Sequence, residues 1–200
     1  MSILEKLNDR QRKAAEKIEG ALLILAGAGS GKTRTITYRI AHMIQELGIS
    51  PYKILAVTFT NKAAKEMKER VEDLIGEDGK RTMVSTFHSF GVRLLRTYGD
   101  RLGYGANFTI YDADDQKRVV KGIMKELVVK DKNLTEGMVV SLISKLKEEE
   151  VSADEYEKAE NKYNMNAAIV SEVYRRYNIA LKNNNGMDFS DILINTAKLL

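Results

Sequence analysis

The chain has 200 residues, of which 44% are hydrophobic and 30% charged, with a net charge of +4, so it is long enough to bury a sizeable core. It contains no cysteine and only two histidines, which excludes disulfides, zinc–thiolate sites and cysteine nucleophiles and disfavours a histidine-rich metal site. No apolar run approaches about 18 residues and the start of the chain carries no signal-peptide core, so we expect a cytoplasmic protein without membrane contact.

Helices and strands alternate in the first half of the chain. Asn8, with Gln11 three residues later, predicts an N-cap and capping box for a helix that runs to about Ile18. We then expect strands at 21–25, 53–58 and 82–86, and helices at 33–47, 61–75 and 89–98, of which the first two end before Gly48 and Gly76. Short apolar strands joined by such helices favour parallel crossovers. The pattern therefore predicts an α/β fold, a parallel sheet with helices on both faces.

A glycine-rich turn joins the first predicted strand to the next helix, with the sequence Ala26, Gly27, Ala28, Gly29, Ser30, Gly31, Lys32, Thr33. This is the P-loop pattern, with alanine in place of its first glycine. Its glycines allow positive φ, so backbone N–H groups can converge on a phosphate at the positive end of the helix dipole. Lys32 would reach the β- and γ-phosphates, and the Thr33 hydroxyl would hold Mg²⁺. The alternative is a turn that binds nothing.

The second half of the chain is mostly helical. We expect a strand at 108–111, helices at 113–129, 135–150, 152–162 and 166–181, a turn at 183–186, and a last amphipathic helix after Asp188. The charge run from Lys145 to Glu150 is expected to face solvent. Three parts follow from this pattern: an α/β core with the P-loop at 1–109, a helical insertion at 110–182, and a return to the core at 183–200. Because the last helix has no C-cap, we expect the chain to be a fragment of a longer protein.

Five further blocks stand in a fixed order along nearly the whole chain. They are Leu-Asn-Asp-Arg-Gln at 7–11, Thr-Phe-Thr-Asn-Lys-Ala-Ala at 58–64, Thr-Phe-His-Ser-Phe at 86–90, Phe-Thr-Ile-Tyr-Asp at 108–112 and Met-Asp-Phe at 187–189. With the P-loop, this set resembles the UvrD/Rep/PcrA-type DNA helicases of superfamily 1. The resemblance implies the first RecA-like ATPase domain, with its helical insertion, of a 3′-to-5′ translocase that uses ATP and Mg²⁺ on single-stranded DNA and at duplex junctions. It also implies a second RecA-like domain in the full-length chain.

The resemblance assigns two residues to the adenine base. Gln11 would read the adenine edge through its amide, and Arg34, directly after the P-loop, would lie against the adenine face. Each has a structural alternative, in which Gln11 only closes the capping box and Arg34 is a solvated residue of the first helical turn.

The resemblance also assigns DNA contacts to the ends of the second and third strands, where parallel α/β sheets place their ligands. Short polar groups would meet phosphates and Phe59 would stack on a base; the residues assigned are Thr58, Phe59, Asn61, Thr86, His88 and Ser89. Structural alternatives remain open for several neighbours: Phe59, Phe87 and Phe90 as core, Thr60 or Ser89 as an N-cap, and Arg93 and Arg96 as a solvated face. The basic surplus lies in this half, where residues 1–100 hold 17 Lys/Arg against 12 Asp/Glu, and it permits phosphate contacts without establishing them.

An acidic Mg²⁺-binding box is the part of the ATPase that these blocks do not supply. Asp154-Glu155-Tyr156 echoes the family's box, but an acidic and polar stretch precedes it in place of an apolar strand, so we interpret it as a solvated helix start. We expect the chain to bind ATP and to turn it over negligibly by itself. The rival readings are the helicase arm of a helicase–nuclease complex and, with less support, a non-helicase P-loop ATPase or kinase. A guanine-specific GTPase is disfavoured because Ala64 stands where its Asn-Lys-x-Asp box needs aspartate.

Overall fold

The computed structural model describes residues 2–160 and 166–200, which form two compact units at 1–87 and 88–200. In chain order the first unit contains η1 (Ile3–Lys6), α1 (Asp9–Glu16), α2 (Lys32–Gln45), η2 (Pro51–Lys53), β1 (Leu55–Thr58), α3 (Asn61–Ile75), α4 (Glu77–Arg81) and β2 (Met83–Thr86). The next helix, α5 (Phe87–Tyr98), begins at Phe87, which is the last residue of the first unit. The second unit continues with η3 (Gly99–Leu102), β3 (Thr109–Ile110), α6 (Ala113–Glu126), α7 (Glu136–Glu148), α8 (Ala153–Glu160), α9 (Ala167–Asn183), β4 (Gly186–Met187) and α10 (Phe189–Leu199).

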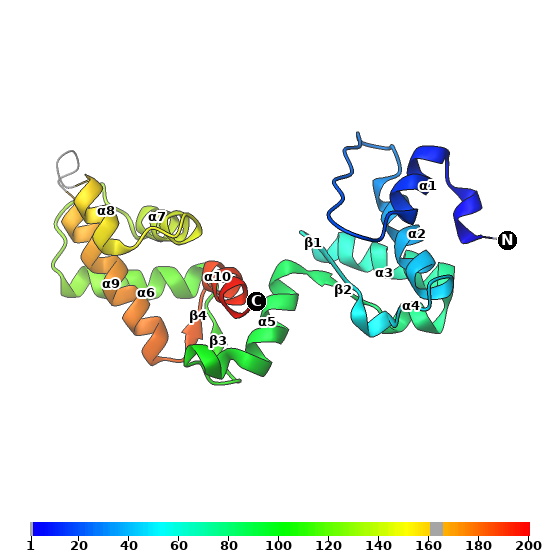
Figure 1. Cartoon of the computed structure of the whole chain (residues 1–200). Coiled ribbons are helices and arrows are strands. Elements are labelled where there is room, and N and C mark those ends of the chain that lie inside the picture. The colour runs from blue at the N-terminus through cyan, green and yellow to red at the C-terminus, as the bar shows by residue number, and fades with distance from the viewer. Residues whose placement is uncertain (1, 161–165) are drawn as a thin grey trace. The chain divides into compact units, whose positions relative to one another are not determined.

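The first unit is built around two parallel strands and the helices that pack on them. β1 pairs with β2 in a register that runs from Leu55 opposite Met83 to Thr58 opposite Thr86, and α3 packs against both strands and against α2 (Figure 1). The shared core consists of Ile40, Ala41, Ile44, Ile54, Val71 and Ile75. As predicted, α3 spans 61–75 and ends at Gly76, whose φ of 61° is readily adopted by glycine. This packing brings the ends of β1 and β2 side by side.

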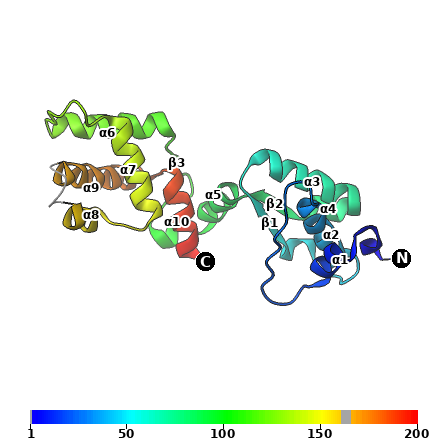
Figure 2. The same ribbon diagram turned by 90° about the horizontal axis from the view of Figure 1, so that it is seen from above.

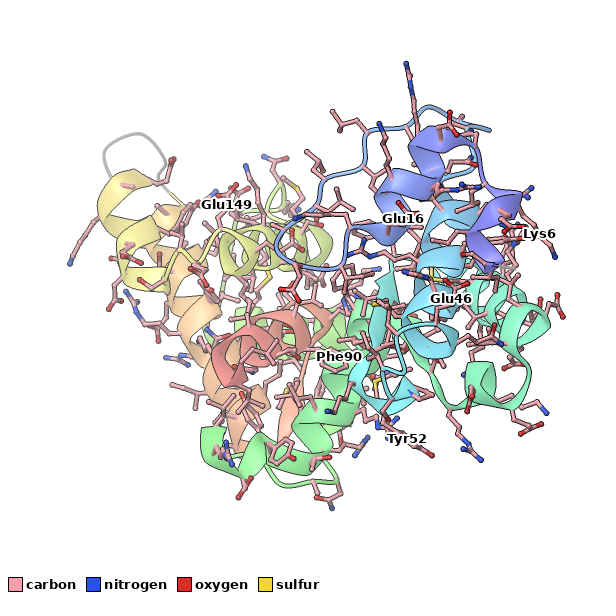
Figure 3. The ribbon with its side chains drawn as sticks, turned by 45° about the vertical axis from the view of Figure 1, so that its right-hand side comes forward. Lys6, Glu16, Glu46, Tyr52, Phe90 and Glu149 are labelled. Carbon is pink, nitrogen blue, oxygen red and sulfur yellow. The ribbon has the colours of Figure 1, made fainter. Side chains whose placement is uncertain are left out.

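A network around Glu46 ties the start of the chain to the C-terminal end of α2. Its carboxylate accepts hydrogen bonds from the backbone N–H of Ile3 at 2.6 Å and from the Ser2 hydroxyl at 3.0 Å, and it lies 2.7 Å from Nδ1 of His42 (Figure 3). These contacts, with the Ile3 N–H first among them, lower the pKa of Glu46. The carboxylate is therefore held in its charged form while it anchors η1.

The segment 21–25, predicted as the first strand, is not a strand in the structure. It runs without regular secondary structure, and the side chains of Leu23 and Leu25 are 80% and 86% exposed. A strand needs a neighbour for its backbone N–H and C=O groups, and within the described residues the sheet of this unit consists of β1 and β2 alone. The apolar run was sufficient to suggest a strand, but the pairing that would make one is not formed.

The second unit is helical, with one short parallel ladder. α6 and α9 lie alongside each other (Figure 2), α8 packs on α9, and α7 packs on α6. β3 pairs with β4 through Thr109 opposite Gly186 and Ile110 opposite Met187. The predicted helices are all present, although the predicted end of one of them at Lys162 lies outside the described residues. The main core of this unit contains Val120, Val139, Ile143, Val170, Val173, Tyr177 and Leu181.

The structure is thus mixed α/β and mostly helical, with two small parallel sheets. The larger sheet with helices on both faces is not formed within residues 2–160 and 166–200. The predicted domains at 1–109, 110–182 and 183–200 stay a prediction. Among the described helices, none combines the length and the apolar character needed to cross a bilayer.

Candidate functional site

The P-loop forms a tight turn that leads directly into α2. Gly29 and Gly31 have φ values of 74° and 87°, a region that disfavours side chains, and α2 begins at the next residue, Lys32. The turn is closed by Ser30, whose hydroxyl donates to the Gly27 carbonyl at 2.7 Å. The backbone therefore adopts the turn-to-helix arrangement that places N–H groups at the positive end of a helix.

Lys32 reaches back across this turn. Its ammonium Nζ donates hydrogen bonds to the carbonyl oxygens of Ala26 and Gly27, each at 2.8 Å. A phosphate in the loop would compete with these two carbonyls for the same ammonium, and as the stronger acceptor it would be favoured. Thr33 follows on the first turn of α2 and is half-buried. Lys32 and Thr33 thus both lie at the N-terminal end of α2, beside the glycine-rich turn.

Gln11 connects α1 to the P-loop, and in doing so it uses both ends of its side-chain amide. Oε1 accepts from the Asn8 backbone N–H at 3.2 Å, completing the capping box, while Nε2 donates to the Ser30 carbonyl at 3.1 Å. A Cβ at Gly31 would lie 2.7 Å from Nε2. The structural alternative of a capping residue is confirmed, and the same side chain also contacts the predicted phosphate-binding loop. Its role toward adenine stays a prediction.

Arg34 lies on the first turn of α2, beside a small cavity. Its Nη2 donates to the Lys6 carbonyl at 2.8 Å, and its guanidinium carbon lies 5.4 Å from the centre of the Tyr38 ring. The cavity has a volume of about 330 Å³ and is lined by Arg34, Thr37, Tyr38, Arg70, Asp73 and Leu74. The planar cation is therefore held in place by a backbone carbonyl and an aromatic ring.

Magnesium would have few protein ligands here. The described residues contain no group of three or more histidine, cysteine, aspartate or glutamate side chains that could hold a metal. The Thr33 hydroxyl, together with phosphate oxygens and water, suits the hard, oxygen-seeking Mg²⁺ ion. Such an ion would neutralise charge on the phosphates and orient them.

Two aromatic rings meet where β1 and β2 end. Phe59 follows β1 and is 88% exposed, and its ring lies 5.5 Å from that of Phe87, tilted by 45°. Phe87 is 42% exposed, so neither phenylalanine is the core residue that the structural alternative described. The alternative is confirmed for Thr60, whose hydroxyl accepts from the Ala63 N–H at 3.1 Å and caps α3. An exposed aromatic pair that the core does not need can stack on a ligand.

The polar residues of the predicted DNA cluster divide between the two units. In the first unit Thr58 and Thr86 stand opposite each other in the ladder, with Thr86 buried, and Asn61 is exposed on the first turn of α3. His88 and Ser89 belong to the second unit, on the first turn of α5.

His88 packs within the second unit against an aromatic ring from α10. The rings of His88 and Phe189 are 5.5 Å apart and meet edge to face at 63°. Phe189 is 48% exposed and lies in one of the quoted sequence blocks, although the sequence analysis assigned it no role. The sequence signal that could have singled out Phe189 is an aromatic residue directly after Asp188, the capping residue of α10.

Arg96 is exposed on α5, in line with the alternative of a solvated helix face, and it also makes contacts within the fold. Its guanidinium donates to the Ala106 carbonyl at 2.6 Å and lies 4.7 Å from the centre of the buried Phe108 ring. The cation thus fastens α5 to the segment before β3. Arg93, on the same helix, is exposed.

The interpretation of Asp154-Glu155-Tyr156 as a helix start is confirmed. Glu155 accepts from the Ser152 N–H at 2.8 Å, and Asp154 forms an ion pair with Arg175 at 2.7 Å. Tyr156 is buried in the helical core. Both carboxylates are engaged in local contacts of α8 and α9, at a helix start with no strand before it.

The expectation that the charge run from Lys145 to Glu150 faces solvent is wrong for Lys147. This residue is 6% exposed, and its ammonium forms ion pairs with Asp188 and Asp191, each at 2.8 Å. The missed signal is spacing, because Lys147 follows the buried residues Val139 and Ile143 at helical intervals. The prediction considered the charge of Lys147 and not its place on the buried face of α7.

Comparisons with known proteins show to which family the chain is related. Residues 7–200 match the family model described as UvrD/REP helicase N-terminal domain. The chain is 44% identical over 198 residues to the ATP-dependent DNA helicase PcrA of Staphylococcus epidermidis and 43% identical over 198 residues to that of Staphylococcus aureus. Each alignment covers 99% of this chain and 27% of the relative, so the chain spans about a quarter of the length of these relatives. The ordered blocks, the P-loop and the match over nearly all residues lead to one conclusion: the chain belongs to the UvrD/Rep helicase family and corresponds to its N-terminal domain.

Proposed function

We propose that the chain is the N-terminal ATP-binding portion of a DNA helicase that couples ATP hydrolysis to 3′-to-5′ movement on single-stranded DNA and to unwinding at duplex junctions. The observation that carries the proposal is the hydrogen-bonded unit of P-loop, Lys32 and Gln11. It joins the predicted phosphate-binding lysine and the predicted adenine-reading amide through one turn of backbone. Family membership supports the same assignment.

In this proposal each side chain acts on ATP by position and charge. The Lys32 ammonium would exchange its hydrogen bonds to the carbonyls of Ala26 and Gly27 for bonds to the β- and γ-phosphates. The Thr33 hydroxyl would hold Mg²⁺. Gln11 and Arg34 meet the adenine base. Bound Mg²⁺ supplies charge neutralisation between the phosphates.

The remaining part of the proposal concerns DNA. Phe59 offers a ring for base stacking, and the polar groups of Thr58, Asn61 and Thr86 contact the backbone. We also propose DNA contacts for His88 and Ser89, which lie on the first turn of α5. The proposed partners are single-stranded DNA and a second RecA-like domain of the full-length protein, and the proposed compartment is the cytoplasm. The exposed pair of Phe59 and Phe87 supports this assignment, because large exposed aromatic surfaces commonly mark binding sites.

Titration of the 200-residue chain with a fluorescent ATP analogue and Mg²⁺ tests the nucleotide site. Lys32→Ala should weaken binding about 10- to 150-fold, the equivalent of one charge-assisted hydrogen-bonding group. The matched control is Lys65→Ala, which removes a lysine with a 78% exposed side chain from α3 and should bind like the parent. Circular dichroism should show both variants folded. Equal affinity of Lys32→Ala and the parent would remove Lys32 from the site.

A further inference from the structure

A buried charged network joins three elements of the second unit. The Asp188 carboxylate, 1% exposed, accepts from Lys147 Nζ of α7 at 2.8 Å and from the Tyr177 hydroxyl of α9 at 2.9 Å. Lys147 also donates to Asp191 at 2.8 Å and lies 5.0 Å from the centre of the Tyr177 ring. All three donor contacts therefore converge on the first turn of α10.

The network does more than neutralise charge, because Asp188 also caps α10. Its second carboxylate oxygen accepts from the Asp191 N–H at 2.8 Å, and the Asp188 N–H donates in return to the Asp191 carboxylate at 3.2 Å. Burial raises the pKa of Tyr177, so its hydroxyl stays protonated and donates. Charge-assisted hydrogen bonds in a buried setting are directional and strong, so they fix where α10 begins.

The middle of α10 also lies close to α5. A Cβ added at Gly91 of α5 would lie 2.5 Å from the Thr196 hydroxyl and 3.0 Å from Cγ2 of Ile192, so the two helices approach closely. Phe189, the residue after Asp188, lies edge to face with His88 at 5.5 Å. A shift of the α10 cap would therefore change the ring that packs on His88.

We propose that Lys147 and Tyr177 are positioning residues for DNA binding: by holding Asp188 they fix the first turn of α10, which keeps Phe189 against His88. The inference rests on the proposed function, because only there is His88 assigned to DNA. It gives a role to α7 and α9, which supply none of the predicted DNA contacts. In this proposal α7 and α9 position His88 indirectly, through Asp188 and Phe189.

The test compares Tyr177→Phe with Tyr174→Phe in the 200-residue chain. Each removes one hydroxyl from a buried tyrosine of α9, but the Tyr174 hydroxyl donates to the Val151 carbonyl at 3.3 Å and not to Asp188. The first readout is the affinity for fluorescent oligo-dT at fixed low salt. The second is the ¹H–¹³C spectrum of the histidine rings, since the chain has only two histidines and His42 lies in the first unit as an internal reference.

Tyr177→Phe should shift the ring signals of His88 while those of His42 stay in place, and it should weaken DNA binding about 2- to 30-fold, the range for residues that act through a packed network. Tyr174→Phe should change neither readout. A purely structural role would lower the unfolding temperature and leave the His88 signals of the folded protein unchanged, which would overturn the proposal.

A second variant disturbs the packing of α5 on α10, and so the contact between His88 and Phe189, without changing the buried charged residues. Gly91→Ala places a methyl group against the Thr196 hydroxyl and Cγ2 of Ile192, so these α10 side chains must give way, and we expect the His88 signals to shift and DNA binding to weaken. It keeps the proposal testable if Tyr177→Phe does not fold, and unchanged His88 signals would then overturn it. If the parent chain binds no single-stranded DNA, the proposed function fails, whereas the histidine signals still decide whether the network positions His88.

Discussion

Truncation of Phe59 to alanine should separate DNA binding from stability. The Phe59 ring is 88% exposed and contacts the ring of Phe87, which is 42% exposed, so its removal takes little apolar surface out of the core. An aromatic pair contributes about 0.5–1.5 kcal/mol, and exposure places this one at the low end. Stacking of one base on an aromatic ring contributes about 1–3 kcal/mol, so affinity for single-stranded DNA should fall about 5- to 150-fold.

The assay is fluorescence anisotropy with labelled oligo-dT at fixed low salt, paired with urea unfolding of the same samples. Tyr52→Ala is the matched control, since Tyr52 (Figure 3) is a 77% exposed aromatic on η2, which precedes β1, whereas Phe59 follows the end of that strand. It should bind DNA like the parent. Equal losses in both variants would show nonspecific stickiness of exposed rings. An unchanged affinity for Phe59→Ala, with a drop of several kcal/mol in stability, would refute the reasoning.

Three further predictions concern the nucleotide loop, acid stability and turnover. Gly31→Ala, at a φ of 87°, should cost about 1–3 kcal/mol of stability in urea unfolding and weaken binding of an ATP analogue, whereas Gly27→Ala, with open space around its Cβ, should unfold like the parent; equal stability of the two would contradict the strained loop. Glu46→Gln should be less stable than the parent at pH 7, and the difference should vanish as the pH falls below about 4, because a carboxylate with a lowered pKa stabilises the fold only while it is ionised; a constant difference from pH 7 to 3 would exclude this role. Phosphate release from ATP should be negligible for the 200-residue chain with or without DNA, and Asp154→Asn combined with Glu155→Gln should leave the rate of a longer polypeptide with the second RecA-like domain unchanged; an abolished rate would make these carboxylates catalytic.

Local sequence determined the elements that depend on neighbours along the chain. The capping box at Asn8, the glycine that ends α3 and the P-loop turn were predicted from the sequence because each is closed by residues within a few positions. The family was readable for a similar reason, since its blocks are short and ordered. The family match over residues 7–200 confirmed that reading.

Tertiary structure decided everything that needed a partner far along the chain. The apolar run at 21–25 is not a strand, because strand formation depends on a paired neighbour and not on composition. Lys147 reads as one more charge in an acidic and basic run, yet it is buried, because its carboxylate partners lie about 40 residues away in sequence. Likewise, the Gln11 amide that closes a local cap also reaches the Ser30 carbonyl, a contact 19 residues distant that only the packing of α1 on α2 creates. Sequence patterns report short-range hydrogen bonds and periodic burial. A long-range ion pair or strand ladder exists only after folding has brought the two interacting segments together.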